Sequence, residues 1–323
     1  MAAILLGIKA GDEVIMPSFT FVSTANAFVL RGAKVRFVDS RSDHPGLDES
    51  QVESLITDKT KAIVVVHYAG VACDMDQIME LAHRYGLYVV EDAAQAIDSF
   101  YKERPLGSIG HLAAFSFHET KNIHSGEGGM LVVNDERFAE RAEIIWEKGT
   151  NRAAFSRHEV DHYNWLDLGS SFLPSEVTAA FLYAQLECLE IIQQRRREIW
   201  QNYHDLLTGE GTAAKNSYLA TITAALSGLN AKLPHIPSYA TNNAHFYYMV
   251  FKIPTQREIF IRKLKDAGIM AISHYQPLHL SPYYEDKHDG RILSQAVHYA
   301  HCLVRLPLYF ELSIGTTLPK PVR

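Results

Sequence analysis

Two short stretches of the chain combine residue types that can carry out chemistry. Residues 88–96 read YVVEDAAQA, an apolar strand-like run that ends in the acidic pair Glu91 and Asp92. Residues 115–122 read FSFHETKN, a second apolar run that leads into a polar turn carrying Lys121. A buried carboxylate is costly unless it has a cationic partner, and ligands of open α/β sheets bind at the carboxyl ends of the strands. We therefore expect the acid and the lysine to meet at one edge of a sheet.

An acid and a lysine on neighbouring strand ends fit the chemistry of pyridoxal phosphate (PLP) enzymes. There a lysine amine forms a Schiff base with the cofactor aldehyde, and a carboxylate keeps the pyridine nitrogen protonated so that the ring acts as an electron sink. In this interpretation Lys121 carries the cofactor as an aldimine and Asp92 faces the ring nitrogen. Taken alone, each residue has a plainer interpretation, since a lysine in a polar turn is usually a solvated charge and an Asp after a strand is usually a turn or cap residue.

The stretches EDAAQA and SFHETKN, followed by GEGG at residues 126–129, resemble the DegT/DnrJ/EryC1/StrS family of PLP-dependent sugar aminotransferases. The resemblance extends from about residue 11 to residue 312. It implies an α/β chain of PLP-dependent transferase fold type I, like aspartate aminotransferase, with a mainly parallel central sheet and a smaller α+β C-terminal domain. Within the family the chain resembles most the enzymes that convert dTDP-4-keto-6-deoxyglucose to dTDP-4-amino-4,6-dideoxygalactose with L-glutamate. That implies a cytoplasmic enzyme of cell-surface polysaccharide biosynthesis, such as that of lipopolysaccharide O-antigen or enterobacterial common antigen.

The resemblance also assigns roles to single residues. Lys121 holds the cofactor and, once the incoming amine releases it, moves a proton between the substrate Cα and C4′ of the cofactor. A related dehydratase branch has a histidine in place of this lysine, so Lys121 favours the aminotransferase. Cofactor contacts are implied for Asp92 (pyridine nitrogen), Gln95 (ring O3′), Ser116 (phosphate), Phe21 (ring stacking), His118 (phosphate or substrate side) and Ser171 (cofactor phosphate of the neighbouring subunit). From spacing alone, Phe21 would be taken for a core residue.

Four further residues are candidates for contacts with the substrate. His67 and Tyr68 follow an apolar run at residues 62–66 and are expected at the same sheet edge as Asp92. His274 and His279, together with Tyr275, resemble family positions near the sugar-nucleotide pocket. For His67 a structural role as a hydrogen-bonded core histidine is an equal alternative. For His274, Tyr275 and His279, loop packing in the small domain is at least as good an interpretation as contact with the substrate.

Repeated strand and helix patterns must position these residues. Apolar runs predict strands at residues 13–16, 34–39, 62–68, 88–92, 113–117 and 131–133. Helical patterns are found at residues 50–56, 76–86, 135–148 and 175–207. This order predicts a right-handed, mainly parallel sheet in a large PLP-binding domain at residues 1–207. The smaller domain at residues 208–323 is expected to begin with a linker, 208–243, and to continue with strands at 245–252 and 270–274 and a helix at 255–267.

Composition and motifs exclude several other functions. With 323 residues, 47% hydrophobic and 21% charged, and a net charge of −6 without a basic stripe, the chain does not suit nucleic acid or an anionic membrane surface. Its three cysteines are far apart, as in reduced cytoplasmic proteins, and it has no apolar run long enough for a membrane span. No metal site is expected, because His118 and His124 are not at the spacing of H-E-x-x-H. The glycines at 126–129 precede a strand, so they do not form a P-loop.

Two expectations concern the ends and the assembly of the chain. In the resembled family about the first fifth of the chain precedes residue 1 of this sequence and supplies a phosphate-binding turn, and a final helix occupies the region of residues 314–323. An alternative function is therefore an impaired family member that keeps the fold as a structural or dimerising protein. The aromatic, unpatterned segment 153–168 is too apolar to remain in water, which predicts a homodimer with shared active sites.

Overall fold

The computed structural model describes residues 1–210 and 217–313. Its largest feature is a six-stranded sheet in the order β2-β1-β3-β4-β7-β8. The strands are β1 (Glu13–Pro17), β2 (Lys34–Val38), β3 (Thr60–Val66), β4 (Tyr88–Asp92), β7 (Leu112–Ser116) and β8 (Gly129–Val133). Neighbouring strands are parallel except for β7 and β8, which are antiparallel. The predicted mainly parallel sheet of fold type I is confirmed.

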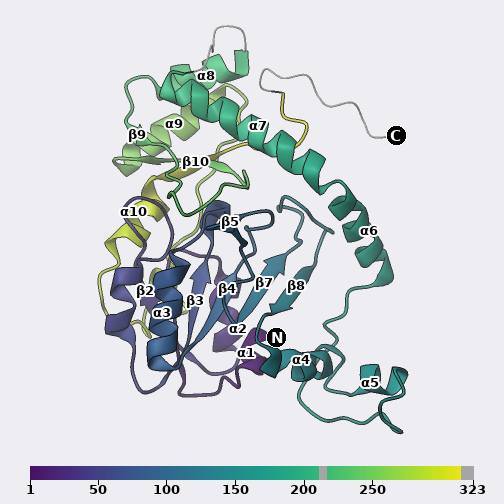
Figure 1. The fold of residues 1–323 in the computed structure, drawn as a ribbon. Coiled ribbons are helices and arrows are strands. Elements are labelled where there is room, and N and C mark those ends of the chain that lie inside the picture. The colour runs from purple at the N-terminus through teal and green to yellow at the C-terminus, as the bar shows by residue number, and fades with distance from the viewer. Residues whose placement is uncertain (211–216, 314–323) are drawn as a thin grey trace.

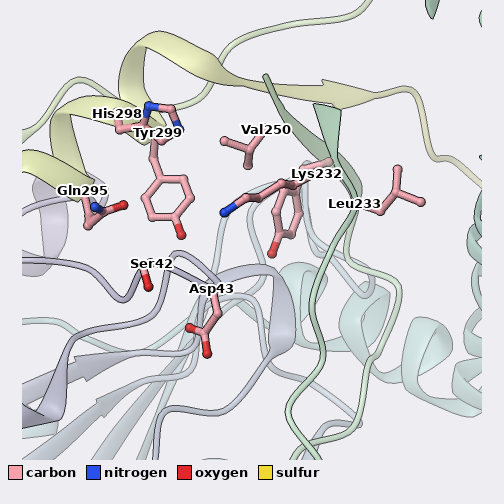
Figure 2. Close-up of a pocket in the computed structure, with 9 residues that line it drawn as sticks. Ser42, Asp43, Lys232, Leu233, Val250, Gln295, His298 and Tyr299 are labelled. Carbon is pink, nitrogen blue, oxygen red and sulfur yellow. The ribbon is translucent and has the colours of Figure 1, made fainter. Parts of the chain in front are cut away.

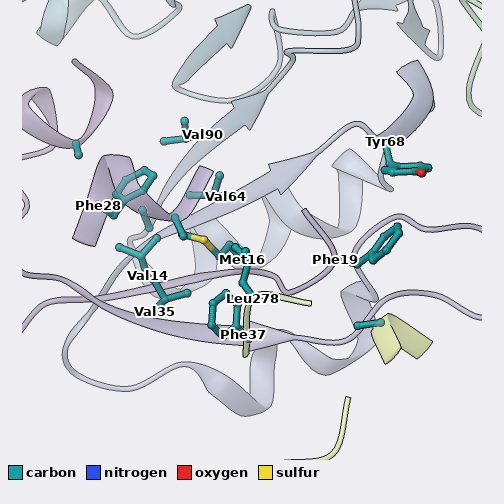
Figure 3. Packing of buried hydrophobic residues seen from close by; sticks show 14 of the residues in the cluster. Val14, Met16, Phe19, Phe28, Val35, Phe37, Val64, Tyr68, Val90 and Leu278 are labelled. Atoms are coloured by element: carbon teal, nitrogen blue, oxygen red, sulfur yellow. The ribbon is translucent and has the colours of Figure 1, made fainter. Parts of the chain in front are cut away.

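Helices cover both faces of this sheet (Figure 1). One face carries α1 (Ala2–Leu5), α2 (Val22–Val29) and α4 (Ala139–Trp146), and the other carries α3 (Met75–Tyr85). Because side chains alternate along a strand, Val14 and Met16 of β1 pack toward α2, whereas Ile15 between them packs toward α3. Figure 3 shows the first of these clusters, with Phe28 of α2 beside Val14 and Val64. Burial on both faces explains the nearly unbroken apolar runs of the strands.

A smaller domain follows, built on a three-stranded antiparallel sheet in the order β11-β10-β9. Its elements are α8 (Ser217–Leu226), β9 (Ala231–Lys232), β10 (Tyr247–Phe251), α9 (Pro254–Asp266), α10 (Ser294–Cys302) and β11 (Leu303–Leu306). Phe251 of β10 and Phe260 of α9 form the centre of its core. Ile199 and Tyr203, which precede residue 208, belong to the same core. The division of the chain at residues 207 and 208 therefore stays a prediction.

The helix expected at residues 175–207 is in fact two helices. They are α6 (Glu176–Glu187) and α7 (Leu189–Thr208), and between them Cys188 has φ −98° and ψ 8°, outside the α-helical region. The predicted cap is present, since the Ser175 side chain accepts a hydrogen bond from the Thr178 N–H at 3.1 Å. α7 packs on the small domain, whereas α6 extends away from the body of the molecule (Figure 1).

Other expectations about single elements were wrong. Residues 208–243 include α8, whose Leu219 and Ile222 are buried in the small-domain core, so they are more than a linker. Residues 270–274 form no strand, because only Ile272 pairs with β11, through an isolated bridge to Arg305. The helix expected at 50–56 consists of two 3-10 turns, Glu49–Gln51 and Glu53–Leu55. The segment 149–169, by contrast, is irregular as expected apart from one short helix, α5 (Arg152–Ser156).

Two features are absent from the part of the chain that the structure describes. A membrane crossing would need a longer and more apolar helix than any found in residues 1–210 and 217–313. The same residues contain no group of three or more His, Cys, Asp or Glu side chains arranged to hold a metal ion. Residues 314–323, where the sequence raised the question of a final helix, lie outside the described residues.

Candidate active site

The ends of three neighbouring strands bring together the residues that the sequence predicts to bind or react with a cofactor. The register of the sheet aligns Val66 of β3, Asp92 of β4 and Ala114 of β7. Beyond β7 the chain turns, and the Lys121 N–H donates to the His118 carbonyl oxygen at 2.9 Å. The turn is closed where the Glu119 N–H donates to the carbonyl oxygen of Gly126, which has a φ of 78° that suits glycine. The GEGG stretch thus returns the chain to β8 beside the lysine.

These strand ends border a large cavity of about 1240 Å³. Its walls come from both domains and include six predicted site residues: Phe21, Asp92, Gln95, Ser116, His118 and Lys121. His274 and Tyr275 of the small domain also line it. Ser171 is predicted to reach the cofactor of the other subunit. All the other residues predicted to contact the cofactor therefore line one cavity.

The Asp92 carboxylate is held in place by hydrogen bonds from its own domain. Its Oδ2 accepts a hydrogen bond from the Thr24 hydroxyl at 2.6 Å, and Oδ1 accepts one from the Ala94 N–H at 3.1 Å. The Thr24 hydroxyl is in turn 2.9 Å from that of Thr20. Thr24 lies in the first turn of α2 and Thr20 just before this helix, so the start of the helix orients the acid. A carboxylate oriented in this way can pair with a cationic ring nitrogen in the cavity.

Lys121 has an amine that is available for chemistry. Its side chain is partly buried, and among the residues that the structure describes it has neither a hydrogen-bond nor an ion-pair partner. Burial lowers the pKa of Lys121 below its ordinary value, the Asp92 carboxylate raises it in part, and the Arg305 guanidinium lowers it further. A lysine with a lowered pKa and no partner is suited to act as a nucleophile and as a base.

Gln95 and Tyr275 join the large domain to the small one at this cavity. Gln95 Oε1 accepts a hydrogen bond from the Ala69 N–H at 2.7 Å, and its Nε2 donates to the Tyr275 hydroxyl at 2.9 Å. Tyr275 has a φ of 45°, a left-handed conformation that is rare for an aromatic residue and is often found at functional sites. The centre of its ring lies 6.1 Å from that of Phe21, which lines the cavity and is 56% exposed.

A buried network of amides fixes the residue after the lysine. Asn122 Nδ2 donates to Gln193 Oε1 at 2.8 Å and to the Asn243 carbonyl oxygen at 2.9 Å. Asn122 Oδ1 lies 2.8 Å from His245 Nδ1. Burial, with the nearby Lys121 charge, lowers the pKa of His245 well below its ordinary value, so the ring is neutral and Nδ1–H donates to Asn122. The network connects the lysine turn to α7 and to the entry into the small domain.

His67 does not lie on the cavity. It is fully buried, and its Nε2 is 2.9 Å from Glu91 Oε2. The Glu91 carboxylate also accepts hydrogen bonds from the backbone N–H groups of Gly107, Ile109 and Gly110 at 2.6 to 2.7 Å. In this arrangement His67 supports a buried carboxylate behind the strand ends, so the expected reach to a substrate is not found in this structure.

Three other predicted residues lie apart from the cavity or contact it indirectly. The Tyr68 hydroxyl is bound to His274 Nδ1 at 2.8 Å, and burial lowers the pKa of His274 to about 2. His279 Nδ1 is 2.7 Å from the Ser18 hydroxyl, and it joins the small domain to the end of β1. Ser171 is exposed and lies in a bridge with Glu147, away from the cavity of its own chain. Of the four predicted substrate residues, only His274 borders the cavity.

The structure adds cavity residues that the sequence did not indicate. Thr24 holds Asp92, Arg196 donates to the carbonyl oxygens of Ala244 and His245, and Arg305 also lines the cavity. Arg305 lies in the RLPLY stretch at residues 305–309, where a charged residue in an apolar strand was an available signal.

A second, smaller cavity of about 360 Å³ lies at another part of the domain junction. Figure 2 shows Ser42 and Asp43 from the loop after β2 on one side, and Lys232 of β9 and Tyr299 of α10 on the other. It shares no lining residue with the cavity of Lys121. The two cavities are therefore separate, and the strand ends border the larger one.

Comparison with known proteins gives consistent matches along almost the whole chain. The model of the DegT/DnrJ/EryC1/StrS aminotransferase family matches residues 1–317. The chain is 34% identical over 326 residues to the spore coat polysaccharide biosynthesis protein SpsC of Bacillus subtilis, covering 97% of this chain and 79% of that one. It is 31% identical over 329 residues to the UDP-4-amino-4-deoxy-L-arabinose--oxoglutarate aminotransferase of Shewanella sediminis, covering 98% and 80%. Among solved structures, the aminotransferase TlmJ of Streptoalloteichus hindustanus has a TM-score of 0.82 at 31% identity, covering 97% of this chain and 78% of that one.

Proposed function

Because the chain belongs to the DegT/DnrJ/EryC1/StrS aminotransferase family, we propose that it transfers the amino group of L-glutamate to a nucleotide-linked 4-keto-6-deoxy sugar. The substrate proposed first is dTDP-4-keto-6-deoxyglucose, with dTDP-4-amino-4,6-dideoxygalactose as the product, for cell-surface polysaccharide. The observation that carries the proposal is the Lys121 amine, for which the described residues provide no partner, on the same cavity as the oriented Asp92 carboxylate.

The residues of the cavity fit PLP as the cofactor. Phe21 offers an exposed aromatic face, Asp92 a fixed carboxylate, Ser116 a hydroxyl at the end of β7, and Lys121 an amine that no residue within 1–210 and 217–313 engages. When bound, PLP would supply an electron sink for negative charge at the substrate carbon. Phe21 would stack on its ring, Asp92 would hold a proton on its nitrogen, Ser116 would contact its phosphate, and His118 would lie on the phosphate or substrate side.

Lys121 is the proposed proton carrier of the reaction. Its lowered pKa allows the neutral amine to exist closer to neutral pH, where it can take a proton from the donor Cα. Thr24 keeps Asp92 in place, and the network around Asn122 keeps the lysine turn in place. The chain thereby positions both the acid and the base before a substrate arrives, which is the form of preorganisation that accelerates proton transfer.

The substrate is tested with a panel of sugar nucleotides. Purified enzyme with PLP and L-glutamate is given dTDP- and UDP-linked 4-keto-6-deoxy sugars, and formation of 2-oxoglutarate is followed by a coupled assay. We expect the dTDP-4-keto-6-deoxy sugar to be aminated fastest. Activity with a UDP sugar and none with any dTDP sugar would overturn the choice of nucleotide.

We further propose that the enzyme is a homodimer in which Ser171 reaches the cofactor phosphate of the other subunit. The proposal is supported by apolar surface on α6 and the segment before it, which project from the body of the molecule (Figure 1). α6 has no buried residue, and Val177 and Trp165 are each 80% exposed. A surface of this kind normally marks a protein interface.

Mixed subunits test the shared site. A Lys121→Ala chain and a Ser171→Glu chain, each impaired alone, should regain activity when mixed, because one hybrid site has both native residues. Sedimentation that finds only monomer at micromolar concentration, with full activity, would contradict the shared site.

A further inference from the structure

The Gln95 carboxamide is held at both ends by residues from two parts of the chain. Its Oε1 accepts a hydrogen bond from the Ala69 N–H at 2.7 Å, and its Nε2 donates to the Tyr275 hydroxyl at 2.9 Å. Asn243 Nδ2 donates to the Gln95 carbonyl oxygen at 2.8 Å, so the backbone is held as well. Gln95 is 6% exposed and lines the same cavity as Lys121. Its amide therefore has one fixed orientation in the wall of the cavity.

The two bonds determine which atom of the amide faces which partner. The Ala69 N–H is a donor, so only the carbonyl oxygen of the Gln95 amide can face it. The nitrogen must then face Tyr275, whose phenol oxygen accepts the bond. An amide nitrogen carries two hydrogens, and the residues within 1–210 and 217–313 use only one of them. The second N–H of Gln95 is therefore left for a ligand in the cavity.

Both partners of the Gln95 side chain have a backbone conformation that is rare for their residue type. Ala69 has a φ of 58° and Tyr275 a φ of 45°, in the left-handed region that favours glycine. Such conformations cost free energy and persist where the surrounding structure needs a group in one particular place. Here the groups are the N–H that holds the amide oxygen and the hydroxyl that holds the amide nitrogen. The strain thus lies at the two residues that orient Gln95.

Tyr275 is itself held firmly in this position. The centre of its ring lies 3.6 Å from that of the stacked His274 ring and 5.7 Å from that of Phe19, which it meets edge-on. Burial raises the pKa of Tyr275, and the Asp92 carboxylate raises it further. The phenol therefore keeps its proton at neutral pH. A fixed, neutral hydroxyl is suited to hold an amide rather than to take part in proton transfer.

We propose that Tyr275 is a positioning residue, whose hydroxyl holds the Gln95 carboxamide so that its second N–H donates to the ring oxygen of bound PLP. This inference rests on the proposed PLP-dependent function and adds a small-domain residue that acts on the cofactor through Gln95. The ring oxygen of PLP is an anionic acceptor beside the nitrogen through which Lys121 would hold the cofactor. A donor to that oxygen draws charge from it and makes the neighbouring nitrogen a weaker base. Tyr275 would thereby influence the pH at which this nitrogen loses its proton.

A pH titration of the visible absorption of the PLP-loaded protein tests the proposal without relying on turnover. The protonated and neutral forms of the bound cofactor absorb at different wavelengths, so the midpoint of the change reports how basic that nitrogen is. Tyr275→Phe keeps the ring and removes the hydroxyl, and it should raise the midpoint by roughly 0.3–1 pH unit, as expected for one weakened hydrogen bond. Gln95→Leu should raise the midpoint at least as far. The matched control is Tyr283→Phe, at a tyrosine of the same segment that is 62% exposed, and it should leave the midpoint unchanged.

The double variant separates positioning from direct contact. If Tyr275 acts through Gln95, adding Tyr275→Phe to Gln95→Leu should cause no further change in the midpoint. A further rise as large as that in the native background would show that Tyr275 contacts the cofactor itself, and it would overturn the positioning role. An unchanged midpoint in Tyr275→Phe alone would overturn it as well.

The outcomes also separate this inference from the proposed function. If the native chain aminates no sugar nucleotide, but its midpoint responds to Tyr275→Phe only while Gln95 is present, the proposed substrate fails and the positioning role stands. If the native chain transaminates, but its midpoint is the same with and without the Tyr275 hydroxyl, the function stands and the positioning role fails. A chain that develops no visible absorption with PLP would overturn both.

Discussion

Removal of the Asn122 side chain should both destabilise the protein and disturb the lysine next to it. Asn122 is buried and makes three hydrogen bonds, to Gln193, to the Asn243 carbonyl oxygen and with His245. In Asn122→Ala, Gln193 Oε1 and the His245 N–H both lose the partner seen in the structure. The Asn243 carbonyl oxygen keeps one, because Gln193 Nε2 also donates to it at 3.3 Å.

The size of the effect follows from this count. A buried polar group left without a partner costs about 1–3 kcal/mol, so two such groups give a loss of about 2–6 kcal/mol in the free energy of unfolding. The turn that carries Lys121 would also lose its link to α7. A shift of the amine by about 1 Å is enough to slow a positioned reaction by about 100-fold. We therefore expect kcat to fall by about that factor, with a smaller change in the KM for glutamate.

Urea unfolding of a double-mutant cycle provides the assay. Asn122→Ala, Gln193→Met and the double variant are compared, and the two changes should couple by about 1–3 kcal/mol because they remove the same bond. Gln194→Met is the matched control, since Gln194 is the exposed neighbour of Gln193 on α7. A loss below about 0.5 kcal/mol for Asn122→Ala, or additive effects in the cycle, would refute the reasoning.

Three further predictions concern charged groups of the site. Burial lowers the pKa of Lys121 below the 10.5 of an unfolded chain. While the amine is charged, this shift reduces the free energy of unfolding, and the loss is recovered as the pH rises toward 10.5. Lys121→Met should therefore raise the urea midpoint at neutral pH, with a gain that shrinks toward pH 10.5; a gain independent of pH would contradict the cause given for the shift. Asp92→Asn should slow transamination by roughly 30- to 1,000-fold, because it leaves the cationic ring nitrogen without its carboxylate; rates within about twofold of the native rate would contradict this role for Asp92. Glu91→Ala should destabilise the fold, since three backbone N–H groups and His67 lose a buried acceptor. A midpoint of urea unfolding equal to that of the exposed control Glu119→Ala would show that this network contributes nothing to stability.

The sequence predicted the sheet and the large-domain side of the site because both depend on local patterns. Apolar runs mark the strands, and parallel strands place their carboxyl ends at one edge, so Asp92 and Ser116 were expected to lie together. Lys121 follows by resemblance and by its position in the turn after β7. The same reasoning placed His67 at that edge, but it could not tell that this side chain points behind the strand ends to Glu91.

The small-domain side of the site depends on contacts between residues far apart in the chain. The strand expected at 270–274 was wrong because His274 and Tyr275 turn into the cavity, where Tyr275 bonds Gln95 from 180 residues away. Arg305 was missed because its place on the cavity wall is visible only once β11 is placed beside β10 and Ile272. The break between α6 and α7 at Cys188 could not be predicted from local sequence, since no Pro or Gly marks it.

The central claim, that Lys121 carries PLP for transamination, is tested most directly by borohydride reduction followed by peptide mapping. The protein is loaded with PLP, reduced, digested and analysed by mass spectrometry, and each preparation is assayed for transamination from L-glutamate before reduction. The account predicts the added cofactor mass on the peptide that contains Lys121, and neither the label nor the activity in Lys121→Ala. A label on another lysine, or full transamination by Lys121→Ala, would contradict it.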